Sequence, residues 1–270
     1  MKSTSYILGT TIAAAASVVA QGSGPYPASH FTEDTLPDHT FYMPSDLQGN
    51  VSLPLLVWGN GACSNDGTAF EGFLTNIASY GYLVVANGPP GGTGSSNAEM
   101  MGAAVTWVSD NIGTNEKYSS VDISKVAAAG QSCGGIEAYA MRSDDRVGIL
   151  GIFNSGFLPD SAEGADTINE VHKPTFYFLG GSEDIAYQNG ERDYHALTGV
   201  PKWVGNYPVG HGGTYWDVDG GAFGVAALSW LQWGLNGDTT AAEFFTAGGA
   251  EATGWIEVES EGLENFPVQA

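Results

Sequence analysis

Basic residues are scarce in this chain. Only 8 of its 270 residues are Lys or Arg, against 30 Asp and Glu, and the formal net charge at pH 7 is −22. So acidic a surface repels nucleic acid and anionic membranes, and we expect neither as a partner. Beyond the first 20 residues, the chain also lacks an apolar run long enough to span a bilayer.

The N-terminus has the layout of a secretory signal peptide. Lys2 precedes an apolar stretch at 6–19, and Val18 and Ala20 occupy the two positions that a signal peptidase inspects. A membrane anchor is the alternative, but the run is short for one. We therefore predict cleavage after residue 20 and a secreted, monomeric protein of one domain, 21–270, that ends in an acidic tail from residue 243.

Cysteine is scarce as well. The chain has only Cys63 and Cys133, and in an oxidising compartment two cysteines usually form one disulfide. Two buried thiols are the alternative. Asn50 opens the one Asn-X-Ser/Thr sequon, in a polar turn, and we predict it as a glycosylation site.

Apolar runs alternate with helical patterns along the chain, which indicates parallel strands joined by crossover helices. Strands are predicted at 53–58, 82–86, 126–129, 148–153, 175–179 and 202–207. Helices are predicted at 68–80, 100–111, 189–197 and 220–234, with another directly after 130–135. The tail either adds a short strand at 255–258 or frays.

The motif that carries chemistry is Gly130-Gln131-Ser132-Cys133-Gly134. It matches G-x-S-x-G and lies between a predicted strand and a predicted helix, as a nucleophile elbow requires. Such a turn is sharp, so the residues two before and two after the serine must lack bulk. The serine hydroxyl then lies at a helix N-terminus, where the helix dipole favours developing negative charge. We predict Ser132 as a nucleophile.

A serine hydroxyl needs a base to take its proton. In enzymes with this elbow the acid and then the histidine follow the serine along the chain, which selects His211 among the five histidines. Asp184 follows the strand at 175–179 closely, so its carboxylate should emerge at the same sheet edge as the serine and orient the imidazole. Glu183 and Asp193 are the alternative acids.

The oxyanion hole should combine the backbone N–H of Cys133 with one from the glycine-rich turn after the first predicted strand. Asn60 is the preferred second donor, and Gly61 is the alternative. Because these two loops should face each other across the site, we predict that a Cys63–Cys133 disulfide fixes the hole.

Substrate specificity should lie in the loops at 87–97, 154–168 and 185–188. From these loops we name Phe157 and Tyr187 as substrate-binding residues. No metal ligands and no cofactor are predicted.

Three stretches, FYMP at 41–44, LPLLVWGNGA at 53–62 and ASYGYLVVA at 78–86, together with the elbow, carry a family resemblance. The chain resembles the dienelactone-hydrolase, cutinase-like polyester-hydrolase and platelet-activating-factor acetylhydrolase branch of the α/β-hydrolases over about residues 40–235. The resemblance implies an α/β-hydrolase fold, with a mostly parallel central sheet and helices on both faces. It also implies cofactor-free esterase chemistry.

The expected function is therefore cleavage of a small-molecule or polymeric carboxylic ester through an acyl-enzyme. A serine peptidase or acyltransferase on the same fold is one alternative, and a catalytically inactive binding scaffold is another. The chain carries Asn154-Ser155-Gly156-Phe157 where some polyester hydrolases have a tryptophan, which argues against polyester activity in particular.

Overall fold

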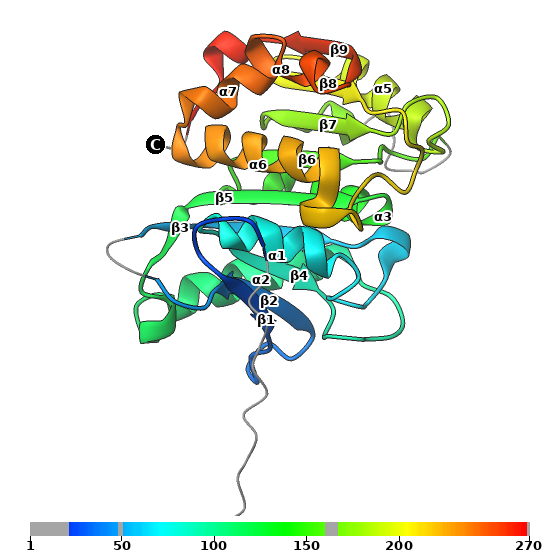
Figure 1. Cartoon of the computed structure of the whole chain (residues 1–270). Coiled ribbons are helices and arrows are strands. Elements are labelled where there is room, and N and C mark those ends of the chain that lie inside the picture. Colours follow the sequence, from blue (N-terminus) through cyan, green and yellow to red (C-terminus); the bar gives the residue numbers. More distant parts are fainter. Residues whose placement is uncertain (1–21, 48–50, 160–166, 269–270) are drawn as a thin grey trace, which may run out of the picture.

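The computed structural model describes residues 22–47, 51–159 and 167–268. The predicted signal peptide and the sequon at Asn50 lie outside these ranges. Within them the chain forms one nine-stranded sheet with helices around it (Figure 1), in the strand order β1-β2-β4-β3-β5-β6-β7-β8-β9. No helix in the described ranges is both long and apolar enough to cross a membrane.

The six central strands, from β4 to β8 in the sheet order, run parallel, while β1, β2 and β9 are antiparallel to their neighbours. The predicted α/β class with a mostly parallel sheet is confirmed. The strands are β1 Ala28–Phe31, β2 His39–Pro44, β3 Leu53–Gly59, β4 Leu83–Asn87, β5 Val121–Gln131, β6 Ile149–Phe153, β7 Thr175–Leu179, β8 Lys202–Asn206 and β9 Ile256–Glu261.

Helices cover both faces of the sheet, because its central strands are apolar on both sides. One face carries α1 Glu71–Ser79, α6 Gly221–Asn236, α7 Thr239–Thr246 and α8 Gly249–Ala252. The other face carries α2 Ala98–Asn111, α3 Cys133–Ala140 and α5 Tyr187–Ala196. The short 3-10 helices are η1 Gly61–Cys63, η2 Glu116–Tyr118, η3 Met141–Ser143, η4 Val218–Gly220 and η5 Leu263–Asn265.

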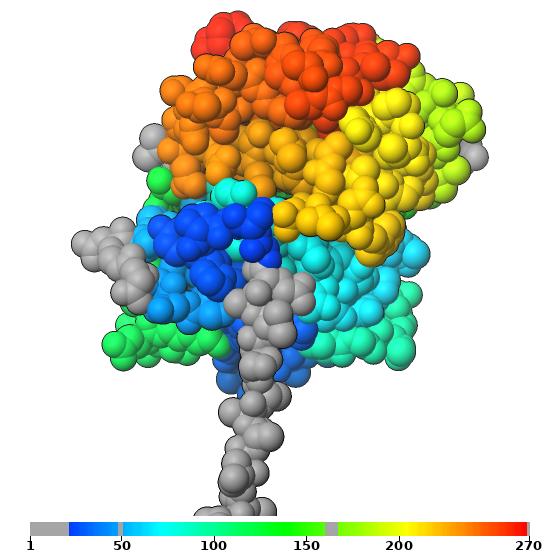
Figure 2. Space-filling view, viewed as in Figure 1, coloured from blue at the N-terminus to red at the C-terminus, as the bar shows by residue number. Residues whose placement is uncertain are grey.

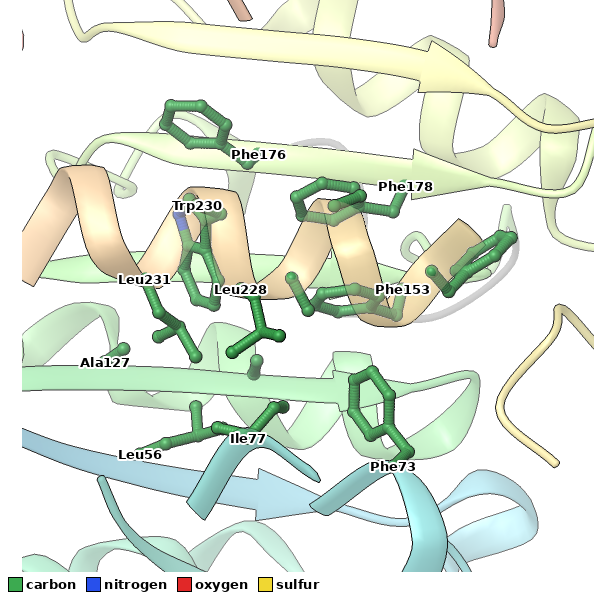
Figure 3. Close-up of a cluster of buried hydrophobic side chains, with 14 of the residues drawn as sticks. Leu56, Phe73, Ile77, Ala127, Phe153, Phe176, Phe178, Leu228, Trp230 and Leu231 are labelled. Carbon is green, nitrogen blue, oxygen red and sulfur yellow. The ribbon is translucent and has the colours of Figure 1, made fainter. Parts of the chain in front are cut away.

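Strand β7 contributes side chains to the hydrophobic cores on both faces of the sheet. Phe176 and Phe178 point to the face covered by α6, where they pack near Trp230 (Figure 3). Tyr177 and Leu179 alternate with them and are buried in the cluster on the opposite face. The side-chain period of two therefore anchors both helical layers to the same five-residue strand.

The register of the central strands brings the ends of four strands to one edge of the sheet. Gly59 at the end of β3 pairs with Gly130 of β5, and Gln131 of β5 pairs with Phe153 of β6. Phe153 in turn pairs with Phe178 of β7. The residues that follow these four parallel strands therefore lie side by side. In open α/β sheets, ligands bind at this carboxyl end of the strands.

Several elements differ from those predicted. β5 begins at Val121, five residues earlier than expected, and β1, β2, α7 and α8 have no counterpart in the predicted set. The tail does not fray, because β9 pairs antiparallel with β8 and is longer than the strand considered at 255–258.

Candidate active site

Ser132 occupies a strained turn between β5 and α3. Its φ of 54° and ψ of −117° lie in a region that side chains disfavour. The turn is fixed from several sides. The amide of Ser132 donates to the carbonyl of Phe153 (2.9 Å), and its carbonyl accepts from the amide of Gly135 (2.9 Å) and the hydroxyl of Ser155 (2.5 Å). Strain of this kind costs about 1–3 kcal/mol and is concentrated at functional sites.

The glycines around Ser132 are required sterically. A Cβ atom on Gly130 would collide with the carbonyl group of Gly134. A Cβ atom on Gly134 would collide with the carbonyl group of Gly59 and lie 2.7 Å from the amide nitrogen of Asn60. The absence of side chains thus lets the turn bend sharply and lets the loop after β3 approach it.

The three residues predicted as nucleophile, base and acid are brought together in a hydrogen-bonded chain. Ser132 Oγ lies 2.9 Å from His211 Nε2, and His211 Nδ1 lies 2.6 Å from Asp184 Oδ1. A carboxylate can only accept, so Nδ1 carries the proton and leaves Nε2 free to accept from the serine hydroxyl. This arrangement can raise the nucleophilicity of Ser132.

Asp184 is buried, and both of its oxygens are fully engaged. Besides His211, Oδ1 accepts from the amide of Ala186 (2.8 Å), while Oδ2 accepts from Asn154 Nδ2 (2.8 Å) and the amide of Gly180 (3.0 Å). Burial alone would raise the pKa of Asp184, but these hydrogen bonds, that of His211 first, outweigh it and lower the pKa. The carboxyl group is therefore held ionised beside the imidazole.

The alternative acids lie elsewhere. Glu183 is exposed to solvent. Asp193 is buried, but it accepts hydrogen bonds from Tyr139 Oη, the amide of Phe157 and the guanidinium of Arg192. Burial raises the pKa of Asp193, so it is also the less readily ionised of the two buried acids.

The loop that carries His211 is tied to neighbouring strands. Gln131 Nε2 donates to the carbonyl of His211 (3.0 Å), and the amide of Gly210 donates to the carbonyl of Gly180 (2.9 Å). Further along, Trp216 Nε1 donates to the carbonyl of Ala69 (3.1 Å). The loop therefore lies against the segment after β3, as the contact of its yellow and gold atoms with cyan atoms shows (Figure 2).

The two predicted oxyanion donors lie on facing segments. Cys133 is the first residue of α3, where a backbone N–H has no partner within the helix. Asn60 follows β3, next to Gly134. Its side chain is buried and donates to the carbonyls of Ser64 (3.0 Å) and Asp66 (3.1 Å) in the following loop and of Asn87 (2.7 Å) at the end of β4.

The predicted disulfide is confirmed. Cys63 and Cys133 are bonded, with their Cα atoms 5.1 Å apart. A carboxylate oxygen of Glu137 lies within 4.8 Å of both sulfurs, a grouping of side chains that could bind a metal. Because a thiolate is the metal-binding form of cysteine, the disulfide leaves this group without its sulfur ligands.

Sequence reasoning missed a buried polar connection between the turn at Asn60 and helix α3. Glu137 on α3 accepts from Ser96 Oγ (2.7 Å) and from Asn87 Nδ2 (2.9 Å), and Asn87 in turn accepts from Asn60. Burial raises the pKa of Glu137, and the two hydrogen bonds oppose that shift. The one available signal was Asn87 directly after a run of apolar strand residues.

A cavity of about 230 Å³ opens beside Ser132. Its apolar lining includes Ile136, Leu158 and Ile185, and His211 also lines it. The predicted substrate-binding residues do not line it. Phe157 is buried against Tyr139, with ring centroids 4.1 Å apart, and lines a separate cavity of about 330 Å³ beside the disulfide. The hydroxyl of Tyr187 donates to Glu257 (3.1 Å).

In this site the hydrogen-bonded pair of Ser132 and His211 lines a cavity with apolar side chains, together with Cys133 at the N-terminus of α3. This arrangement is suited to acyl transfer. Compared with known proteins, the chain matches no protein-family model and no curated protein. The family resemblance therefore depends on the motifs alone.

Proposed function

We propose that this protein is a secreted serine hydrolase of the α/β-hydrolase fold that cleaves carboxylic esters through an acyl-enzyme. The observation that carries the proposal is the chain of hydrogen bonds from Ser132 Oγ through His211 to Asp184, at 2.9 and 2.6 Å. The disulfide agrees with secretion, because such bonds persist in oxidising compartments.

In the proposed reaction Ser132 Oγ attacks the ester carbonyl while His211 Nε2 takes its proton. The carbonyl oxygen becomes an oxyanion, which the amides of Cys133 and Asn60 stabilise. Collapse of this intermediate expels the alcohol, which receives the proton from His211. Water then repeats the sequence on the acyl-enzyme, releasing the carboxylic acid and restoring Ser132, while Asp184 stabilises the imidazolium in both halves.

The cavity supports an ester with an apolar acyl group of modest size. Leu158 and Ile185, which line it, are 55% and 80% exposed, so an acyl chain that enters would cover apolar surface that otherwise meets water. The strongly acidic composition disfavours anionic substrates. We therefore propose an uncharged ester.

Hydrolysis of p-nitrophenyl esters from acetate to decanoate tests this function, with an unstructured peptide as the comparison. We expect turnover of the esters but not of the peptide, and a Ser132→Ala variant that folds but loses about four to six orders of magnitude in kcat. Equal release of p-nitrophenol by the wild type and Ser132→Ala would refute the proposal. Peptide cleavage that depends on Ser132 would favour the peptidase.

A further inference from the structure

Asn154 is the first residue after β6, and it is fully buried. Its φ of 43° is left-handed, a conformation in which asparagine is tolerated better than most side chains. Its amide donates to the carbonyl of Phe178 (2.7 Å), which continues the β6–β7 pairing by one residue. The side chain is thereby directed to the edge where the functional loops emerge.

That side chain links the acid to the histidine loop. Asn154 Nδ2 donates to Asp184 Oδ2 (2.8 Å) and, more weakly, to the carbonyl of Gly210 (3.4 Å), the residue before His211. The oxygen of the same amide, Oδ1, accepts from Tyr215 Oη (2.5 Å). Because Tyr215 donates to Oδ1, the amide cannot turn its oxygen toward Asp184 without losing this bond.

Tyr215 is itself immobilised. It is 1% exposed, and its ring packs edge-on against Phe70 and Phe73, with ring centroids 5.1 and 5.2 Å away. It lies only four residues after His211. Both ends of the His211 loop therefore meet Asn154, one through the carbonyl of Gly210 and the other through the hydroxyl of Tyr215.

We propose that Asn154 and Tyr215 are positioning residues for the triad acid: Tyr215 fixes the orientation of the Asn154 amide, and that amide holds Asp184 so that Oδ1 faces His211. The inference depends on the proposed function, because it assigns these residues a role in orienting a catalytic base. Without the Asn154 donor, Oδ2 would keep only the amide of Gly180, and a buried carboxylate would lose a hydrogen bond that stabilises its charge.

The informative variant is Asn154→Asp, which keeps the shape of the side chain. Its carboxyl would lie about where the amide is, 2.8 Å from Asp184 Oδ2, and two carboxylates this close cannot both be ionised easily. While the introduced carboxyl stays protonated, its O–H can replace the lost N–H donor. The other titratable groups in contact with the pair are His211 and Tyr215, and the neighbouring Glu183 is exposed.

The experiment measures kcat and KM for p-nitrophenyl butyrate as a function of pH. For Asn154→Asp we expect near wild-type turnover at the acidic end and a new descending limb as pH rises, when the second carboxyl ionises and repels Asp184. For Tyr215→Phe we expect kcat to fall about threefold to tenfold with KM unchanged, and for Asn154→Ala about tenfold to a hundredfold.

Two matched controls separate positioning from stability. Asn206→Asp makes the same change at a buried asparagine that donates to Glu191 (2.8 Å). Tyr82→Phe removes a buried hydroxyl that accepts from Asn236 (3.0 Å). Both should leave kcat and its pH profile unchanged.

A second readout does not need ester turnover. The proton on His211 Nδ1 should give a far-downfield NMR resonance, which Asn154→Ala and Tyr215→Phe should shift or broaden while the controls leave it in place. An unchanged resonance together with wild-type pH profiles in all three variants would overturn the inference. If the wild type itself hydrolyses no ester, the proposed function fails, and the resonance still reports whether Asn154 positions the pair.

Discussion

The disulfide between Cys63 and Cys133, whose Cα atoms lie 5.1 Å apart, joins the segment after β3 to the first residue of α3. These are the two segments that carry the proposed oxyanion donors. The bond closes a loop with a sequence separation of 70 residues. The chain-entropy model assigns such a loop about 4 kcal/mol of stabilisation, and engineered bridges often deliver less.

We expect loss of this bond to impair catalysis as well as stability. In a Cys63→Ala/Cys133→Ala variant kcat should fall about tenfold to a hundredfold, approaching the effect of removing one oxyanion donor. Reductant should lower the kcat of the wild type in the same way and leave the double variant unaffected. A variant with lowered melting temperature and wild-type kcat would show that the bond is only structural.

The assignment of the acid is tested by two neighbouring positions. Asp184→Asn keeps the shape of the side chain but presents a donor to His211 Nδ1, so the imidazole takes the wrong tautomer and kcat should fall roughly 10⁴-fold. Glu183→Gln changes an exposed group and should stay within about twofold of the wild type. If steady-state kinetics instead showed the large loss of kcat for Glu183→Gln and little loss for Asp184→Asn, Glu183 would be the acid.

The cavity beside Ser132 predicts a dependence on acyl length. Each buried methylene is worth about 0.8 kcal/mol, so kcat/KM should rise by up to about fourfold per added carbon until the cavity of about 230 Å³ is full. Leu158→Ser and Ile185→Ser should weaken this rise and leave acetate hydrolysis little changed. Val225→Ser, at a comparably exposed valine that does not line the cavity, is the control. An unaltered length profile in both cavity variants would place the acyl group elsewhere.

The elements that could be predicted from the sequence are those whose own residues have a clear apolar pattern. The run TFYFL is apolar at every position but its first, and it forms β7 with the predicted bounds, Thr175–Leu179. Other elements depend on context. β2, His39–Pro44, ends in proline and begins with a polar residue, and it is a strand because β4 and β1 pair with it on its two sides. α7 was not predicted, although Asp238 directly before it is a typical helix N-cap residue.

Some residues of the site could also be predicted from local sequence, and others could not. The elbow around Ser132 and the order of Asp184 and His211 can be recognised from local motifs, and in the structure His211 is hydrogen-bonded to both of the others. The partnership of Asn154 with Tyr215, 61 residues later, depends on strand register and on how the loop after β8 folds back. No local pattern carries that information, and the same holds for which side chains line the cavity.

The most direct test of the proposed function is covalent labelling of the folded protein with a fluorophosphonate, followed by peptide mapping. A serine activated by His211 should be phosphonylated at Ser132 with loss of esterase activity in proportion, while Ser132→Ala and heat-unfolded protein stay unlabelled. We predict a single adduct, on Ser132. An unlabelled wild type, or an adduct on another serine that tracks the loss of activity, would contradict it.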